Sequence, residues 1–377
     1  MTEVSFNHVQ IDGLKTVIPE CCIRIDDELD YFDGNPKKLA RAKKMMGYGC
    51  RYIADELTTV TDMAVSAAEK LMTEMQVNRD EIDLLIFVNQ KPDYKEPNDA
   101  CIAHGRLGLK KTCAAIPIVL GCSGYVYGLW LAHSLLASGS GKKCLLLAGD
   151  IPTRVCNKDN RKTAQLFSDA ASATLLSYTP KKDVFSSFVI GNDGTGWDKL
   201  IVPFGGSKLP VRKDVVDLQV QDSSMNKWTV EDSMMQGEDV FNFTMDIAPA
   251  LINKTMEFAG WTVDDVDLFA IHQANKQIVE NIISKAQIPA EKAPSDIFSK
   301  YANNSTNSVV TVLCDSAKKL KNVVLCAFGI GLSWGGAALN LSQTYNGGIS
   351  TYIPPQNRPT RQEQIRHWIN YFKGEDE

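Results

Sequence analysis

Residues 116–150, IPIVLGCSGYVYGLWLAHSLLASGSGKKCLLLAGD, predict a strand, a helix and a second strand in direct succession. The apolar run over 116–120 ends at a Gly-Cys-Ser-Gly turn, after which apolar residues recur three and four positions apart, as they do on one face of a helix. Glycines at 139 and 141 end this period, and the apolar run over 144–148 is typical of a buried strand. Strand-like runs and helical stretches also alternate along the rest of the chain, which indicates an α/β protein with much parallel sheet.

Cys122 stands at the turn between that first strand and the helix. Most cysteines are small buried apolar residues, and this is the expectation for most of the ten in the chain. A thiol at a helix N-terminus differs, because unpaired backbone N–H groups and the positive end of the helix dipole favour the nucleophilic thiolate. Gly121 and Gly124 permit a tight turn and the close approach of a ligand. Cys122 is therefore a candidate nucleophile, with an expected pKa below the free value of about 8.5.

The composition excludes several classes of protein. The 377 residues carry a formal net charge of −5, with acidic and basic residues mixed along the chain, so nothing indicates nucleic-acid binding. The N-terminus is too polar for a signal peptide, and no apolar run approaches the ~20 residues that a membrane span needs. Ten cysteines without a C-x-x-C pair and five histidines without H-E-x-x-H spacing predict reduced thiols, a cytoplasmic location and no metal site.

Two pairs of segments reveal an internal duplication. RDEIDLLIFVNQ (79–90) resembles VDDVDLFAIHQ (263–273), and KKCLLLAGD (142–150) resembles KNVVLCAFG (321–329). The two pairs occur in the same order and at nearly the same offset, which is about half the chain. Chance similarity explains one such match more readily than two, so we expect two similar halves.

This duplication places Asn303 opposite Cys122. The average of the two offsets carries Cys122 onto Asn303, where a polar turn again precedes an expected helix, over 308–318. His272 ends the strand-like stretch of the second half, where ligands of open α/β sheets collect. A lone histidine is more often a satisfied buried residue. A cysteine, a histidine and an asparagine that all follow strands of a duplicated fold instead predict a catalytic site.

Six stretches carry a resemblance to a known family. They are PDYKEPNDACIAHGRLGL (92–109), GCSGYVYGL (121–129), NRKTAQLFSDAASATLL (160–176), IHQANKQIV (271–279), YANNSTNS (301–308) and AFGIGLSWGGA (327–337). Together they resemble the 3-oxoacyl-acyl-carrier-protein synthase III family of the thiolase superfamily. The resemblance implies an α/β, thiolase-like, five-layer α-β-α-β-α fold of two duplicated halves. We expect the halves over 1–178 and 179–345, followed by a C-terminal extension over 346–377.

The resemblance also implies a reaction, a role in fatty acid biosynthesis and a homodimer. Cys122 would take an acyl group from an acyl-CoA or acyl-carrier-protein thioester, and a malonyl thioester would then lose CO₂. His272 and Asn303 would hydrogen-bond the thioester carbonyl and stabilise the enolate, which attacks the acyl-cysteine. The backbone N–H groups of Cys122 and Gly331 would form the oxyanion hole. Neither a cofactor nor a metal is implied. The substrate-binding positions carried over are Arg161, Lys276, Gln277, Phe328 and Ile330.

Several of these positions depart from the family pattern. Gln277 replaces a frequent arginine, Gly49 falls where another arginine would clamp the adenine of coenzyme A, and Ile330 replaces the middle of three glycines. Glu96 stands where the family tends to place an apolar residue that reaches the acyl tunnel of the partner subunit. The basic stretch over 36–44 could dock an acidic carrier protein, although a solvated helix face is the commoner meaning of such a run.

Three functions remain open at this stage. The first is a decarboxylative condensing enzyme. The second is an acyltransferase that moves the acyl group from Cys122 to an alcohol or an amine without condensation. The third is a non-catalytic dimeric binding scaffold, in which Cys122 would be unreactive. Retention of both His272 and Asn303 favours condensation.

Overall fold

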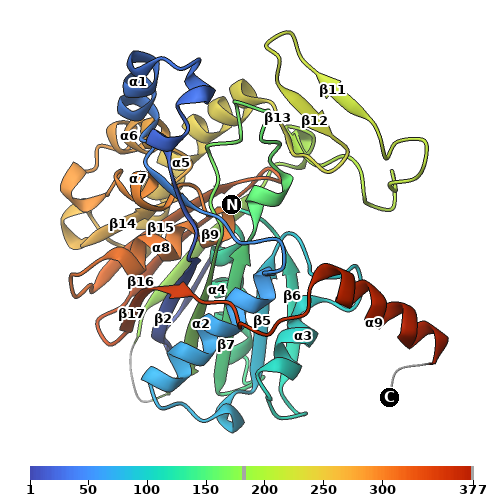
Figure 1. The fold of residues 1–377 in the computed structure, drawn as a ribbon. Coiled ribbons are helices and arrows are strands. Elements are labelled where there is room, and N and C mark those ends of the chain that lie inside the picture. The colour runs from blue at the N-terminus through green and yellow to red at the C-terminus, as the bar shows by residue number, and fades with distance from the viewer. Residues whose placement is uncertain (181–183, 375–377) are drawn as a thin grey trace.

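The computed structural model of the chain describes residues 1–180 and 184–374. Its two large sheets have helices between them and on their outer faces (Figure 1). The helices are α1 (Pro36–Met46), α2 (Val60–Glu74), α3 (Asp99–Arg106), α4 (Gly124–Ala137), α5 (Gly237–Ala259), α6 (Lys276–Lys285), α7 (Ile297–Tyr301), α8 (Ser308–Asp315) and α9 (Arg361–Lys373). Helices α4 and α8 contact strands of both sheets, whereas α2 and α5 cover opposite outer faces. This helix-sheet-helix-sheet-helix order confirms the predicted fold class. Within the described ranges, no helix is long and apolar enough to cross a bilayer.

The larger sheet has six strands in the order β17-β2-β8-β7-β5-β6. They are β2 (Val9–Pro19), β5 (Leu84–Asn89), β6 (Ala114–Val119), β7 (Lys143–Asp150), β8 (Ala170–Tyr178) and β17 (Tyr345–Tyr352). β5 pairs in parallel with β6 and β7, whereas β8 is antiparallel to β7 and β2. Helices cover both faces of β5 and β7, and this double burial explains why their sequences are almost continuously apolar. β6, α4 and β7 are the strand, helix and strand predicted over 116–150.

The second sheet has five strands in the order β1-β9-β16-β15-β14. They are β1 (Thr2–Phe6), β9 (Ser186–Asn192), β14 (Leu268–Ile271), β15 (Asn322–Gly329) and β16 (Ser333–Asn340). β14 is parallel to β15, and β16 is antiparallel to β15 and β9. The strands β14, β15, β16 and β9 therefore have the same order and relative directions as β5, β7, β8 and β2 of the first sheet. This correspondence confirms the predicted duplication.

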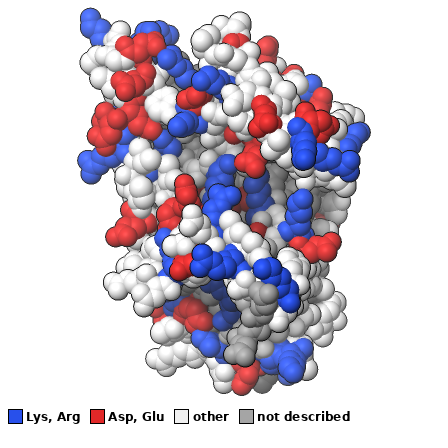
Figure 2. Space-filling view, turned by 45° about the vertical axis from the view of Figure 1, so that its right-hand side comes forward, with Lys and Arg blue, Asp and Glu red and all other residues white. Residues whose placement is uncertain are grey.

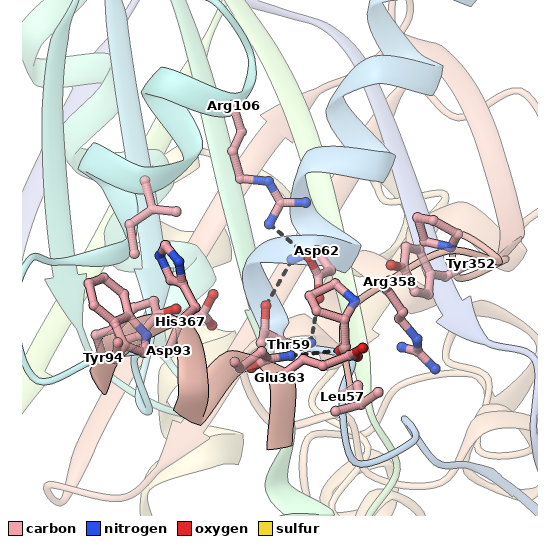
Figure 3. A pocket seen from close by; sticks show the side chains of 15 residues that line it. Leu57, Thr59, Asp62, Asp93, Tyr94, Arg106, Tyr352, Arg358, Glu363 and His367 are labelled. Atoms are coloured by element: carbon pink, nitrogen blue, oxygen red, sulfur yellow. Dashed lines mark hydrogen bonds and ion pairs between the residues drawn. The ribbon is translucent and has the colours of Figure 1, made fainter. Parts of the chain in front are cut away.

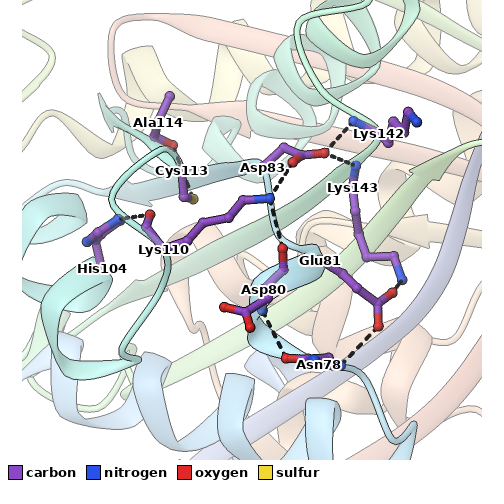
Figure 4. Close-up of polar contacts among 10 residues, drawn as sticks. All are labelled: Asn78, Asp80, Glu81, Asp83, His104, Lys110, Cys113, Ala114, Lys142 and Lys143. Atoms are coloured by element: carbon purple, nitrogen blue, oxygen red, sulfur yellow. Dashed lines mark hydrogen bonds and ion pairs between the residues drawn. The ribbon is translucent and has the colours of Figure 1, made fainter.

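One carboxylate in each half explains why the duplicated sequence is recognisable. Asp83, just before β5, accepts the backbone N–H of Lys142 at 2.7 Å where β7 begins, and it also binds Nζ of Lys110 at 2.7 Å (Figure 4). Asp267, just before β14, accepts the backbone N–H of Lys321 at 2.7 Å where β15 begins. Each aspartate therefore ties the first residues of two neighbouring parallel strands together, which gives both halves the same local pattern.

Both ends of the chain cross between the halves. β1 lies at the N-terminus but pairs with β9 in the sheet of the second half. β17 includes the first residues of the expected extension and pairs in parallel with β2 in the sheet of the first half. Strands on either side of the expected boundaries at residues 178 and 345 thus pair within one sheet. The division of the chain into those units stays a prediction.

The helix expected over 308–318 is shorter in the structure, where α8 ends at Asp315. The amide Nδ2 of Asn346 donates to the carbonyl oxygens of Leu313 and Ser316, at 3.0 Å each. These bonds satisfy carbonyl groups that the next helical turn would otherwise use. The lysines that follow belong to the loop before β15.

Short strand pairs lie outside the two large sheets. They are β3 (Cys22–Arg24) with β4 (Cys50–Tyr52), β10 (Leu200–Ile201) with β13 (Met234–Met235), and β11 (Gln219–Gln221) with β12 (Lys227–Thr229). The β11-β12 hairpin projects from the body of the molecule (Figure 1). The chain returns from it through β13 into α5, and Met235 of β13 lines the cavity described next.

Candidate active site

A cavity of about 270 Å³ brings Cys122, His272 and Asn303 together. Cys122 precedes α4 of the first half, His272 follows β14, and Asn303 precedes α8 of the second half. The starts of the two central helices therefore meet at one point, as the duplication predicted. Most of the remaining wall is apolar, with Met46, Leu166, Phe167, Leu200, Met235, Val240, Phe241, Ile278 and Phe328 among the lining residues. Such a wall excludes water and suits a flexible acyl or pantetheine chain.

Cys122 is only 8% exposed, and this burial changes its expected acidity. Burial raises the pKa of the Cys122 thiol to about 11, and the carboxyl group of Asp150 adds to the rise. The hydroxyl of Ser305 and the backbone N–H groups of Ile330 and of Cys122 itself favour the thiolate but only partly offset these effects. The expected pKa below about 8.5 is therefore wrong for the resting site, because the helix start cannot compensate for the loss of water.

The end of β15 comes unusually close to the thiol. A Cβ atom at Gly329 would lie 2.9 Å from Sγ of Cys122, so this position has no room for a side chain. The backbone N–H of the next residue, Ile330, favours the ionised form of the thiol. The oxyanion-hole position at Gly331 stays a prediction, and Ile330 is a second candidate because its N–H favours the Cys122 thiolate. The side chain of Ile330 lies against Gly121 and is not among the groups that line the cavity.

His272 is 2% exposed, and its backbone N–H donates to the carbonyl oxygen of Cys326 at 2.8 Å, which extends the pairing of β14 with β15. Its ring meets that of Phe328 edge to face, with centroids 5.3 Å apart. Burial lowers the pKa of His272 to about 4, so the ring is neutral at pH 7. A neutral imidazole can donate one hydrogen bond without bringing a charge into the apolar cavity.

Asn303 is held by its backbone and by its side chain. Its N–H donates to the carbonyl of Leu166 at 3.1 Å, and its carbonyl accepts the N–H of Ser168 at 3.0 Å, which joins the two halves. Oδ1 of Asn303 accepts the backbone N–H of Ser305 at 2.9 Å. This bond fixes the amide orientation and leaves the Nδ2 protons available as donors.

The predicted substrate-binding residues separate into two groups. Phe328 and Gln277 line the cavity of the triad. Lys276 is not in its wall, and its Nζ lies 3.6 Å from a carboxylate oxygen of Glu280. Arg161 pairs with Asp33 at 2.9 Å beside a separate open hollow that Lys158 and Lys227 also line.

The basic stretch over 36–44 forms most of α1. Its cations are exposed or half-buried, and two of them are paired: Lys38 with Asp33 and Lys43 with Asp26, at 2.7 Å each. Figure 2 shows basic and acidic side chains interspersed over the face that it draws. These contacts favour the interpretation of the stretch as a solvated helix face.

A larger hollow of about 760 Å³ lies between α9 and the segments around α2 and α3 (Figure 3). The two arginines that line it form ion pairs with carboxylates: Arg106 with Asp62 at 2.7 Å, and Arg358 with Asp55 at 2.8 Å. The triad residues do not line it.

Sequence reasoning missed Ser305, which adjoins Cys122, and Asp150, whose charge acts on the thiol. Oγ of Ser305 lies 4.0 Å from Sγ of Cys122, and Asp150 ends β7. A signal for both existed. Ser305 belongs to the polar run that follows Asn303, and Asp150 stands at the carboxyl end of a parallel strand, the same location that singled out His272.

The raised pKa of Cys122 gives a testable pH dependence. Only the thiolate reacts with iodoacetamide, so the labelling rate of Cys122 should rise about tenfold per pH unit from pH 7 to pH 10. At pH 7 it should be slower than that of Cys101, which is exposed. Peptide mapping after timed labelling measures both rates. A Cys122 rate that levels off below pH 8 would mean that the helix start outweighs burial.

Comparisons with known proteins agree with this geometry. Residues 118–194 match the family model for 3-oxoacyl-(acyl-carrier-protein) synthase III, and residues 256–341 match the model for its C-terminal part. A provisionally named 3-oxoacyl-(acyl-carrier-protein) synthase 3 of Campylobacter jejuni is 37% identical over 92% of this chain and 98% of its own. A β-ketoacyl-(acyl-carrier-protein) synthase III of Syntrophomonas wolfei is 33% identical over 88% of this chain and 97% of its own. The crystal structure of a Burkholderia xenovorans 3-oxoacyl-(acyl-carrier-protein) synthase superposes with a TM-score of 0.84 at 33% identity, covering 93% of this chain and 99% of that one.

Proposed function

The chain belongs to the 3-oxoacyl-(acyl-carrier-protein) synthase III family, and on this basis we propose that it condenses an acyl thioester with a malonyl thioester through an acyl-Cys122 intermediate. The observation that carries the proposal is the meeting of Cys122, His272 and Asn303 in one apolar cavity. The donors are thioesters of coenzyme A or of an acyl carrier protein, and the reaction needs no cofactor.

In the first half-reaction, Cys122 attacks the thioester carbonyl and the donor thiol leaves. In this proposal the backbone N–H groups of Cys122 and Ile330, both of which favour the thiolate of Cys122, bind the oxyanion that develops on the carbonyl. The apolar wall holds the acyl chain and keeps water from hydrolysing the acyl-enzyme.

In the second half-reaction, a malonyl thioester loses CO₂ and leaves an enolate. This step requires hydrogen-bond donors at the thioester carbonyl but no base to remove a proton. Neutral His272 and the Nδ2 group of Asn303 supply such donors, because Oδ1 of Asn303 is already occupied by Ser305. The enolate then attacks the acyl group on Cys122 and releases the 3-oxoacyl product.

Intact-mass spectrometry tests this scheme directly. The wild-type protein should gain the mass of one acyl group when incubated with its cognate acyl-CoA from a panel, and malonyl donor should then remove that group with release of CO₂. Transfer of the acyl group to an added alcohol or amine, without CO₂ release, would instead establish the acyltransferase function. An unmodified mass with every acyl-CoA and acyl carrier protein tested would leave only the scaffold function.

We also propose that the active unit is a homodimer. β6 is an edge strand that pairs only with β5 among the described strands, and its last residue, Val119, is 73% exposed. An exposed apolar edge of this kind is normally covered by another chain. Glu96 is exposed on the loop before α3 and would then lie near the acyl tunnel of the partner.

Light scattering over a concentration series should therefore give twice the chain mass of 41.6 kDa. The same samples should be assayed for condensation at each concentration. A monomer that turns over at full rate would contradict the dimer proposal and leave the reaction assignment intact.

A further inference from the structure

Two buried serines, one from each half of the chain, contact each other next to the nucleophile. Ser123 directly follows Cys122, and Ser333 is the first residue of β16. They are 0% and 1% exposed, and their Oγ atoms lie 2.7 Å apart. Neither serine lines the cavity of the triad, so their hydrogen bond has a purpose other than contact with the acyl donor.

Ser123 does not perform the usual task of a serine at its position. It is the N-cap residue of α4, where a serine side chain normally accepts a backbone N–H of the first helical turn. The side chain of Ser123 makes no such bond, and its hydroxyl is instead paired with Ser333. The start of α4 therefore goes without this cap, and the hydroxyl connects the turn of the nucleophile to the second half.

The directions of these hydrogen bonds follow from the number of protons. Oγ of Ser333 donates to the carbonyl oxygen of Ile330 at 2.7 Å, which uses the single proton of that hydroxyl. Ser333 must then accept from Ser123, whose own proton serves this bond. The chain of bonds runs from the hydroxyl of Ser123 through that of Ser333 to the carbonyl of Ile330, and each hydroxyl donates once.

Ile330 belongs to the tight loop that joins β15 to β16. Gly329 and Ser333 are paired at the ends of these strands, so the loop consists of residues 330–332. The same end of β15 lies against the nucleophile, because a Cβ atom at Gly329 would be 2.9 Å from Sγ of Cys122. The serines therefore tie the loop to the turn at the place where the two segments meet.

The two donors of the proposed oxyanion hole come from segments that are far apart in the chain, so covalent geometry does not set their spacing. Both must reach the oxyanion at hydrogen-bond distance, and a misplacement of about 1 Å can cost about 10²-fold in rate. We propose that Ser123 and Ser333 are positioning residues that hold the N–H of Ile330 in place beside the N–H of Cys122. The inference rests on the proposed function for its acyl transfer, and the experiment below separates the two.

Only some steps of the reaction should need the serine pair, Ser123 and Ser333. An oxyanion develops when Cys122 attacks the donor thioester, and again when the enolate attacks the acyl-cysteine. Loss of CO₂ from a malonyl thioester instead uses the side-chain donors of His272 and Asn303. Acylation and decarboxylation should therefore respond differently when the serine pair is broken.

Ser333→Ala removes both side-chain bonds of the chain. Acyl-enzyme formation at saturating acyl-CoA should slow about 10- to 10²-fold, because the N–H of Ile330 is no longer held in place. The acyl-CoA concentration that gives half the maximal rate should not change, since neither serine lines the cavity. Decarboxylation of a malonyl thioester should keep the wild-type rate. Leu332 still exchanges backbone bonds with Asp193, at 2.9 and 3.1 Å, so the loop should stay folded.

Ser123→Ala and the double variant show whether the serines act as one chain. Ser123→Ala keeps the bond from Ser333 to Ile330 but separates it from the turn of the nucleophile, so acylation should slow here too. The double variant should be no slower than Ser333→Ala alone, because residues of one hydrogen-bond network are coupled. Multiplication of the two single effects would mean that each serine acts on its own, which contradicts the proposal.

The pH midpoint of Cys122 alkylation by iodoacetamide is a readout that does not depend on the reaction. The N–H of Ile330 favours the thiolate, so its release in Ser333→Ala should raise this midpoint. The carboxyl group of Asp150, which opposes the thiolate, is the same in both proteins. A serine pair that only stabilised the fold would leave the midpoint where it is.

Ser187→Ala is the matched control. Ser187 is 0% exposed in β9, and its hydroxyl has no hydrogen-bond partner among the described residues. This variant also loses a buried hydroxyl, but its acylation rate and alkylation midpoint should equal those of wild type.

Three results with Ser333→Ala would overturn the proposal: acylation at the wild-type rate, an equal fall of acylation and decarboxylation, or an unchanged alkylation midpoint. If wild type forms no acyl-enzyme with any donor, the proposed function fails. The alkylation midpoints would then still show whether the serine pair holds the N–H of Ile330 against the thiol of Cys122.

Discussion

Cys122→Ala should form no acyl-enzyme with any acyl donor. The acyl carbon must bond to a nucleophilic sulfur in the cavity, and the other nine thiols do not line it. Intact mass should therefore stay at the unmodified value during incubation with acyl-CoA. Decarboxylation of a malonyl thioester should persist, uncoupled from condensation, because His272 and Asn303 remain in place.

Cys144→Ala is the matched control for this loss. Cys144 is fully buried in β7 of the same half and lies outside the cavity wall. The control should acylate as wild type does, which separates the loss of a nucleophile from the loss of a buried thiol. Acylation of Cys122→Ala at the wild-type rate would move the nucleophile to another residue and overturn the assignment.

His272→Ala and Asn303→Ala should still accept an acyl group on Cys122 but lose decarboxylation. Each variant removes a donor aimed at the carbonyl where negative charge develops, and such a loss costs about 10²- to 10³-fold in rate. Intact mass follows the acyl-enzyme, and CO₂ release follows the malonyl donor, so the two half-reactions are measured separately. The oxyanion hole for acylation uses backbone N–H groups and should survive both substitutions.

His133→Ala is the control for His272→Ala. His133 is also fully buried with its pKa lowered to about 4, but Nδ1 contacts the carbonyl of Leu129 at 2.8 Å within α4. It should retain both half-reactions. If acylation falls as far as decarboxylation in His272→Ala, the histidine activates the thiol. The site would then be a Cys-His acyltransferase dyad, and the second function would replace the first.

Much of the fold was predictable because its signals are local. Apolar periodicity over 116–150 is set by the backbone period of each element, so strand, helix and strand followed from the sequence. The duplication was visible because Asp83 and Asp267 perform the same task in each half. The end of α8 was not visible, because it depends on Asn346, which is remote in sequence. The exchange of β1 and β17 between the halves depends in the same way on pairing between distant segments.

The sequence by itself determined which residue types follow the strands. The offset between the halves was enough to pair Cys122 with Asn303, and the end of a strand-like stretch singled out His272. Only the tertiary structure decided the acidity of Cys122, because the groups that remove water from the thiol come from both halves. It also brought the N–H of Ile330 to act on the thiolate of Cys122, since the direction of a backbone N–H depends on how β15 ends. The hydrogen bond from the hydroxyl of Thr306 to Asp150 joins residues 156 positions apart, and no local pattern encodes such a contact. The burial of a side chain and the direction of its hydrogen bonds depend on residues that are distant in sequence. Both are therefore fixed only when the two halves pack together.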